Sequence, residues 1–525
     1  MVSTSGDEVR EGLSSVTRGT LFLLVAALAY VGISFVSRVI VVDGISQGEW
    51  NAFSLALTFS AVLSAIGTLG LPNAIARSLP FTSSDSDRRT MVRGTLAVGA
   101  ASGIAGAVVL YVFARPIGVA LSSSDLSAAD LTLSLQFFAI TIATSVVSTL
   151  IASIFQGYED ALPNALFLST LNPALFIVFL LLTESFLPLG QQFVGALAAY
   201  VIADVAVLLL LLLYYQRRMP LRSGPITAGF DRRLLAFALP LLVVGALTSV
   251  SGSGDTLILG FIHRPEVGFY TATLSLARLL GIGLSSLGFI FLPVAARYLR
   301  NRDYSALKLT YATATKWTLV VALPLFLVFF FLPSRSLTFV YGPAYAMPIL
   351  PLRIVVIGAF AASLLGPAAA AQIAYGRTQL VLLNTVAAAV SDVVLSFLLI
   401  PAHGAVGAAV AWSVSTFVYP LLSTVEMAFL EDLHPFKRHY LVPLLVTAAP
   451  LSVVLAFWPS QAPLWQLPAI AIGVALLFVF VVLVTRSVDR GDRLLLEAVE
   501  RFLGRRLPVV RRLSRWLAGP ALTSL

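Results

Sequence analysis

A few ionisable residues interrupt long apolar runs of the sequence, and their types suggest specific chemistry. Asp204 stands in "YVIADVAVL", Asp392 in "AAAVSDVVLSF" and Arg278 in "TLSLARLLGIG". A carboxylate in such a setting can hold a proton or a sodium ion, and a guanidinium offers forked donors to phosphate oxygens. Asp204 and Asp392 are therefore candidates for coupling to H+ or Na+. Arg278 is a candidate for binding a phosphate-bearing substrate.

Each of these residues also has a structural explanation, which stays open at the level of sequence. The two carboxylates are suited to accept hydrogen bonds from serines such as Ser391, or to pair with Arg278. Arg278 is equally suited to an ion pair with a neighbouring helix. An ionisable group at bilayer depth costs about 2.5–3.5 kcal/mol on insertion scales, so either a partner or a wet cavity is required.

A further acid, Asp255 in "SGSGDTLILGF", belongs to an internal repeat. The stretch "SRVIVVDGISQGEWNAFSLA" from Ser37 aligns with "GDTLILGFIHRPEVGFYTAT" from Gly254, which places Arg38 opposite Asp255. Both stretches run from the end of an apolar helix through a short turn into the next apolar segment. We hypothesise that Arg38 and Asp255 form a latch at an outer gate. The alternatives are that each pairs within its own half of the repeat, or that Arg38 binds phosphate directly.

Sequence motifs of catalytic chemistry are absent. The four histidines, His263, His403, His434 and His439, do not form an HExxH zinc pattern, and the chain has no cysteine. No P-loop, nucleophile elbow or paired-carboxylate glycosidase site is recognisable. We therefore expect no catalytic residue, no metal site and no cofactor, and we do not expect an enzyme.

The composition places these residues in a membrane. The 525-residue chain is 58% hydrophobic and 11% charged, whereas about 25% of the residues of a soluble domain are charged. The formal net charge of +9 does not indicate nucleic-acid binding, because the basic residues lie between hydrophobic segments rather than on a soluble face. We expect membrane lipids, and no nucleic acid, among the partners.

The apolar runs predict an all-α integral membrane protein with about 14 transmembrane helices. They form two six-helix lobes in a parallel repeat, followed by two C-terminal helices. The predicted spans are 21–42, 53–71, 94–113, 133–155, 164–182, 194–214, 234–261, 269–292, 317–332, 349–373, 380–400, 406–427, 441–458 and 467–484.

Four regions follow from these spans. Residues 1–220 form the N-terminal lobe, 221–432 the C-terminal lobe and 433–485 two additional spans, while 486–525 form a basic amphipathic tail. Arginines gather in alternate loops, which by the positive-inside rule places both termini in the cytoplasm. The leucines and arginines of the tail are spaced as in a helix that lies on an anionic inner leaflet. The expected location is the plasma membrane.

The repeat and several loops resemble a known family. The "PEVGFYTATLSLARLL" turn, the "GYEDALPNA" and "YGRTQL" loops and the glycine-alanine starts at Gly195 and Gly407 are similar to those of polysaccharide-biosynthesis flippases of the multidrug/oligosaccharidyl-lipid/polysaccharide exporter superfamily. The resemblance implies translocation of a polyprenyl-(pyro)phosphate-linked oligosaccharide from the inner to the outer leaflet by alternating access, with glycan-assembly enzymes as partners. Charged residues in the central cavity of the lipid II branch correspond, as a type only, to Arg38 and Arg278.

Two other functions remain open. A cation-coupled multidrug exporter of the same superfamily shares the architecture, but its cavity is expected to be more acidic than basic. A membrane-embedded polysaccharide polymerase, ligase or glycosyltransferase would be expected to carry a sizeable extramembrane loop, and the outer loops here are short. Undecaprenyl and dolichyl carriers both fit the sequence.

Overall fold

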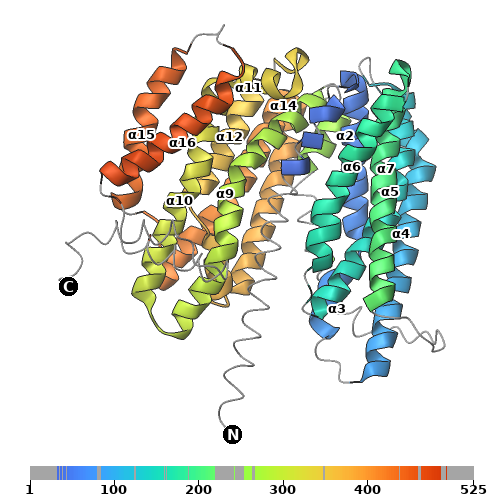
Figure 1. The fold of residues 1–525 in the computed structure, drawn as a ribbon, viewed down its shortest axis with the longest axis horizontal. Helices are drawn as coiled ribbons and strands as arrows, with labels where there is room; N and C mark the ends of the chain where they lie inside the picture. The colour runs from blue at the N-terminus through green and yellow to red at the C-terminus, as the bar shows by residue number, and fades with distance from the viewer. Residues whose placement is uncertain are drawn as a thin grey trace. The chain divides into compact units, whose positions relative to one another are not determined.

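The computed structural model is helical throughout the residues that it describes (Figure 1). The described residues are 32–218, 242, 254–485, 487 and 492, with short gaps at 35, 38, 43, 80–83, 123–125, 159, 161, 187, 263–265, 347–348, 437, 459–462 and 486. Arg38 and almost all of the predicted amphipathic tail lie outside them, as does most of the predicted seventh span.

The main helices follow one another with short connections. They are α2 (Gln47–Gly67), α3 (Leu71–Ser78), α4 (Asp85–Leu121), α5 (Ala128–Gly157), the π-helical η2 (Asn164–Leu171), α6 (Asn172–Phe186), η3 (Leu189–Gln191), α7 (Gln192–Arg218), α9 (Val267–Arg300), α10 (Tyr304–Phe331), α11 (Pro333–Tyr341), η5 (Pro343–Tyr345), α12 (Ile349–Leu364), α13 (Ala368–Ala374), α14 (Thr378–Glu431), α15 (Arg438–Ala456) and α16 (Gln466–Val484).

Within the described part of the chain, 10 helices are long and apolar enough to cross a membrane. The longest, α14, is two helices joined at Gly404, whose φ of 53° is not helical. The predicted all-helical membrane fold is confirmed. The span predicted at 317–332 begins instead at Tyr304 in α10, because Lys308 and Lys316 interrupt the apolar pattern without ending the helix.

The chain divides into two compact units. The first unit comprises Val25–Ala272 and Ala389–Ala411, and the second comprises Met1–Leu24, Thr273–Ala388 and Trp412–Leu525, each as far as the structure describes them. In the first unit α5 packs against α2, α3, α4 and α7; in the second, α10 packs against α12, α15 and α16. The predicted lobe boundary at residue 220 stays a prediction.

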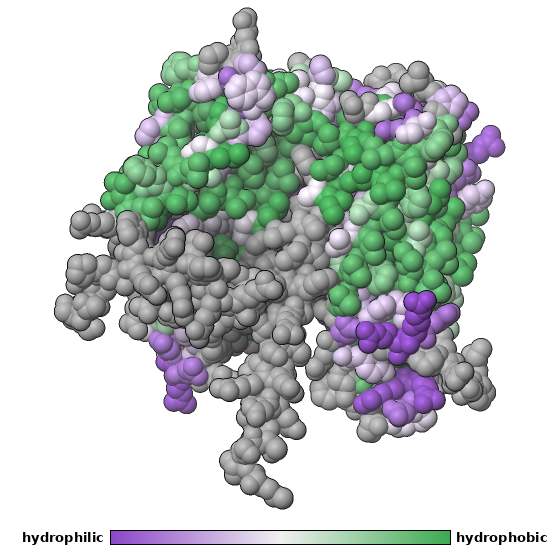
Figure 2. All heavy atoms as spheres, viewed as in Figure 1, coloured by the Kyte–Doolittle hydropathy of each residue, from purple (hydrophilic) through white to green (hydrophobic). Residues whose placement is uncertain are grey.

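Apolar side chains cover the outside of the helices, as a lipid environment requires. Figure 2 shows hydrophobic residues over the sides of the helices and hydrophilic residues towards their ends. On α4 the exposed apolar residues include Val108, Val112 and Phe113, which are 55%, 61% and 54% exposed. Such a surface would be a liability in water but is the expected lipid-facing surface of a membrane protein.

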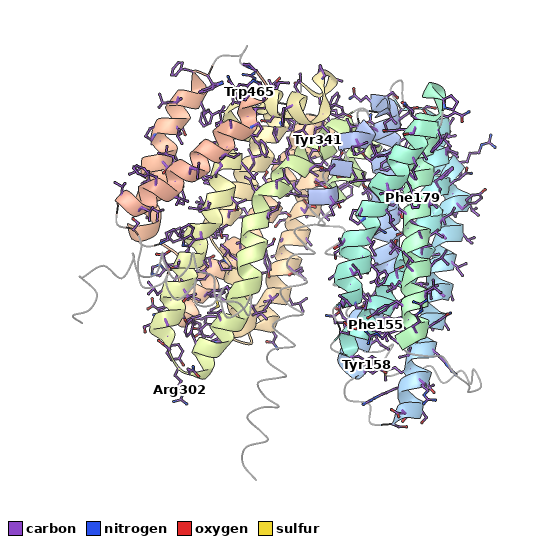
Figure 3. All side chains as sticks on the ribbon, in the orientation of Figure 1. Phe155, Tyr158, Phe179, Arg302, Tyr341 and Trp465 are labelled. Carbon is purple, nitrogen blue, oxygen red and sulfur yellow. The ribbon has the colours of Figure 1, made fainter. Side chains whose placement is uncertain are left out.

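The second unit has aromatic residues at one end and a polar turn at the other. In Figure 3, Tyr341 and Trp465 lie at one end of its helices, while Arg302 lies at the opposite end, in the turn between α9 and α10. Arg302 has a φ of 57°, a conformation that suits glycine better. The positive-inside rule predicts that the Arg302 end faces the cytoplasm.

Glu49 and Glu266, which occupy equivalent positions in the two aligned stretches of the repeat, each accept a hydrogen bond at the start of a helix. Glu49 accepts a hydrogen bond from the Ser46 N–H at 2.7 Å within a capping box at the start of α2. Glu266 accepts one from the N–H of Ala405, directly after the break at Gly404. Each carboxylate satisfies a backbone donor that a helix start leaves without an intrahelical partner.

Candidate functional site

Asp255 and Asp392 form a pair of fully buried carboxylates in the first unit. Both residues are 0% exposed, and they are close enough for the charge of Asp255 to act on Asp392. Asp255 lies in the helical stretch 254–262, and Asp392 lies in the first half of α14. Like charges in a low-dielectric interior disfavour simultaneous ionisation. Simultaneous ionisation of the two carboxylates is therefore unfavourable, and a proton or a cation would relieve the repulsion between them.

The two carboxylates differ in their hydrogen bonding. Asp255 accepts hydrogen bonds from the hydroxyl of Tyr270 and, at 2.7 Å, from the N–H of Thr256. Neither oxygen of Asp392 has a hydrogen-bond partner among the described residues, and the hydroxyl of Ser396, one helical turn later, has none either. The predicted hydrogen bond from Ser391 to Asp392 is therefore not formed within the described part. An ionised carboxylate that is buried without a hydrogen-bond partner destabilises the folded protein unless a ligand neutralises its charge.

Other oxygen atoms surround this pair. The Tyr270 hydroxyl that donates to Asp255 lies 3.3 Å from the carbonyl oxygen of Ala408, in the second half of α14. Carboxylate, hydroxyl and carbonyl oxygens are ligands that hard cations prefer. Among the described residues, no group of three or more His, Cys, Asp or Glu side chains could hold a metal ion.

Asp204 has a different environment, although the sequence suggested the same role for it. The hydroxyl of Thr144 on α5 and the Nδ2 of Asn172 at the start of α6 both donate to its carboxylate, the latter at 2.9 Å. Asp204 thus ties α7 to α5 and α6 through two neutral donors. This is the kind of structural hydrogen bonding that the sequence left open.

Arg278 lies on α9 with an exposed side chain, within a segment apolar enough to span a membrane. Its predicted contact with phosphate stays a prediction. The proposed latch between Arg38 and Asp255 stays one too, because Arg38 lies outside the described residues.

A contact between the starts of α2 and α9 was not anticipated from sequence. The Oδ1 of Asn51 accepts a hydrogen bond from the N–H of Gly268 at 2.7 Å, and the Nε1 of Trp50 donates to the carbonyl oxygen of Gly268 at 3.3 Å. Both polar groups of one peptide segment are thus held by neighbouring side chains of α2. A Cβ on Gly268 would overlap Asn51 Oδ1 and lie 2.7 Å from Trp50 Cδ1, so a side chain cannot be accommodated there.

Replacing Gly268 with alanine will separate α2 from α9 at this contact. In the naturally cysteine-free chain, a single cysteine at Ser54, which is 5% exposed, will then react faster with a maleimide. Gly281→Ala is the matched control on the same helix, because a Cβ at Gly281 meets nothing within 4 Å. Equal labelling rates in the two variants would show that the contact does not hold the helices together.

A second polar cluster, in the second unit, surrounds Glu426 on α14. Its Oε2 accepts hydrogen bonds from Gln372 Nε2 at 2.6 Å and Asn384 Nδ2 at 2.7 Å. Ser423, one turn earlier, donates to Gln372 Oε1 at 3.0 Å. The amides of Gln372 and Asn384 therefore make helix-to-helix hydrogen bonds here. In the sequence, the sign of this cluster was the three-residue spacing of Ser423 and Glu426, which places both on one face of a helix.

Glu426→Leu will destabilise the protein because it removes the acceptor of two amide donors, at a cost of about 1–3 kcal/mol for each donor left buried without a partner. Glu431→Gln is the control: Glu431 forms an ion pair with Arg377 at 2.7 Å, but the Arg377 side chain is 45% exposed, and such pairs contribute about 0–1 kcal/mol. Thermal unfolding in detergent measures both. A similar melting temperature for the two variants would contradict the assigned role of Glu426.

Near this cluster the membrane helix formed by α12 and α13 is interrupted. The helical conformation is interrupted between Leu364 and Ala368, where Gly366 has a φ of 69°. The hydroxyl of Tyr311 on α10 donates to the carbonyl oxygen of Leu365 at 2.7 Å, which satisfies an acceptor freed by the break. Interrupted helices with satisfied backbone groups are a recurrent feature of transporters.

The fold is shared with solved membrane transporters. The structure is similar to one titled "Lipid II flippase MurJ, inward closed conformation", with a TM-score of 0.72 and 14% identity over 87% of this chain and 98% of that chain. It is also similar to an inward-facing multidrug resistance MATE family transporter of the MOP superfamily, with a TM-score of 0.56 and 15% identity over 77% and 96% of the two chains. A MOP superfamily transporter from Pyrococcus furiosus gives a TM-score of 0.53 and 14% identity over 78% and 94%.

These likenesses define the class: an α-helical integral membrane protein with the fold of the MOP superfamily transporters. Within that class, the chain belongs to the polysaccharide biosynthesis protein family, which it matches over residues 16–286, slightly more than half of its length. The resemblance inferred from the loops and the repeat is thus confirmed. No curated protein matches the sequence.

Proposed function

We propose that the protein is a flippase that moves a polyprenyl-(pyro)phosphate-linked oligosaccharide from the inner to the outer leaflet by alternating access. The observation that carries this proposal is the exposed Arg278 within a membrane span of a chain that belongs to a polysaccharide biosynthesis family. A guanidinium in this setting suits an anionic lipid carrier. The lipid II flippase title among the structural neighbours is in keeping with such a substrate.

Cation coupling is the second part of the proposal. The pair of Asp255 and Asp392 supplies a buried negative charge that a proton or Na+ would neutralise, and Asp392 has no hydrogen-bond partner among the described residues. Binding of the cation would then bias the conformation of the transporter. Asp204 remains a second candidate, with the difference that neutral donors already satisfy its carboxylate.

The outer gate is the third part. We propose that the starts of α2 and α9 meet in one state of alternating access and separate in the other. The hydrogen bonds between the side chains of Trp50 and Asn51 and the backbone of Gly268 are suited to the state in which the outer gate is closed, because a small displacement of the helices breaks them. A latch between Arg38 and Asp255 would act near the same segment.

The function is tested by following the lipid-linked glycan. Purified protein reconstituted into vesicles should move labelled polyprenyl-pyrophosphate oligosaccharide from one leaflet to the other, as measured by its exposure to a glycosidase added outside. Deletion of the gene should make the glycan accumulate on the inner leaflet. Transport of cationic drugs with no movement of the glycan would instead favour a multidrug exporter. Elongation or transfer of the glycan would favour an enzyme.

A further inference from the structure

The second unit contains a buried ion pair that the proposed transport function does not use. The Nζ of Lys316 on α10 lies 2.7 Å from the Oδ2 of Asp492, and both side chains are only 2% exposed. Lys316 stands 12 residues after the start of α10 and inside a segment long and apolar enough to span the membrane. Asp492 lies beyond the end of the last span, α16. A pair of charges at this depth requires complete hydrogen bonding to be tolerated.

Both charged groups have further partners. Lys316 Nζ also donates to the carbonyl oxygen of Ser487 at 2.8 Å, and the Nε1 of the adjacent Trp317 donates to Asp492 Oδ1 at 2.6 Å. Each oxygen of the Asp492 carboxylate therefore accepts one hydrogen bond from α10. The ammonium contacts two separate residues that follow α16. Removal of any one partner would leave a buried charge or donor uncompensated.

The helix that carries Lys316 is the one on which the C-terminal helices pack. Both α15 and α16 lie against α10, and they also contact each other. Ser487, three residues beyond the end of α16, is 2% exposed, and its hydroxyl lies 2.8 Å from that of Thr485. The chain that leaves α16 is thus held to the side of α10 at both described residues, Ser487 and Asp492.

We propose that Lys316 and Trp317 form an intramolecular docking site for the chain that follows the last span. The site binds the Asp492 carboxylate and the Ser487 carbonyl, and it locks the end of α16 to α10. Apolar packing alone would allow helices in lipid to slide or rotate against one another, since lipid competes equally well for an apolar surface. A charge pair of fixed geometry permits one register, because any other arrangement leaves both charges buried and unpaired.

Accessibility of Ser487 tests this docking site. Ser487→Cys gives a single thiol in a cysteine-free chain, and maleimide labelling of the detergent-purified protein reports how often the chain after α16 leaves α10. We expect slow labelling with Lys316 and Asp492 intact. Asp492→Asn, which keeps the shape but removes the charge, should raise the labelling rate about tenfold or more, since a loss of about 1.4 kcal/mol already changes a population tenfold. Lys316→Met should have a similar effect, and Trp317→Phe a smaller one.

A second pair of the same chemistry on the same helix serves as the control. Lys308 on α10 lies 2.5 Å from Asp432, but their side chains are 34% and 82% exposed. The hydrogen bond from Lys308 holds the pKa of Asp432 below its ordinary value. Lys308→Met removes an equivalent charge, and labelling of Ser487→Cys should not change.

Combined substitutions separate docking from general damage. In the double variant Lys316→Met with Asp492→Asn, labelling should be no faster than in either single variant, because both remove the same interaction. Size-exclusion chromatography establishes that each variant is folded before labelling. The proposal is overturned if Asp492→Asn and Trp317→Phe both leave the thiol as protected as it is with Lys316 and Asp492 intact, or if Lys308→Met exposes it equally. These results are independent of whether the protein moves a lipid-linked glycan.

Discussion

Replacing Arg278 with alanine is expected to reduce transport of the lipid-linked glycan about 10-fold or more, because hydrogen bonds to a charged group contribute about 1.5–3 kcal/mol. The transport rate of Arg278→Lys should lie between those of the unaltered protein and Arg278→Ala. Lysine keeps the charge but loses the forked geometry that matches phosphate oxygens. The measurement is the initial rate of glycan movement in vesicles at matched protein levels.

Arg302→Gly is the control for this prediction. It removes the same charge from the turn at the end of α9, and the positive φ of Arg302 is one that glycine adopts without strain. Transport should be nearly unchanged. If Arg278→Ala transports as well as the unaltered protein, Arg278 does not bind the carrier phosphate, although other evidence for a flippase would stand.

The second large effect is expected on the response of thermal stability to Na+ or acid, when Asp392 is replaced. The unaltered protein should be stabilised by Na+ or by acidification, because a ligand that binds only the folded state at 100 times its dissociation constant adds about 2.7 kcal/mol. Asp392→Asn keeps the shape and removes one of two neighbouring charges. It should raise the melting temperature in the absence of the cation, since a buried carboxylate without a hydrogen-bond partner among the described residues is lost.

The same substitution should abolish the response to the cation. Neither Na+ nor acid should shift the melting temperature of Asp392→Asn further, and transport should become independent of the cation gradient. Ser396→Ala, one helical turn away and likewise buried, is the control and should retain the response. A response that survives in Asp392→Asn but disappears in Asp204→Asn would move the coupling site to Asp204.

The sequence by itself determined the class of protein and the family. Apolar runs of about 20 residues leave a helix as the spanning structure, because no other backbone in such a run satisfies its own hydrogen bonds in lipid. The turn "PEVGFYTATLSLARLL" and its companion loops were sufficient for the family, which the match over residues 16–286 confirms. Because charges are rare in the apolar runs, the sequence also identified Asp204, Asp392 and Arg278 as candidate functional residues.

The partners of these charges were decided only by tertiary structure. Asp204 and Asp392 look alike in the sequence, yet one is held by Thr144 and Asn172 while the other lies near Asp255 with no hydrogen-bond partner among the described residues. Helical spacing shows which residues share a face, but it does not show which helix covers that face. The difference between a carboxylate that has hydrogen-bond donors and one that has none among the described residues is therefore invisible in the sequence.

Lys316 is a second charge whose partners cannot be predicted from the sequence. In the apolar pattern it marked the edge of a span, because a charge normally lies outside the hydrocarbon region. In the structure it lies inside α10, since Asp492, the carbonyl of Ser487 and the neighbouring helices remove the cost of its burial. Ser487 and Asp492 lie 171 and 176 residues from Lys316 along the chain. Local sequence determines where helices form, whereas contacts between distant segments determine which charges they can bury.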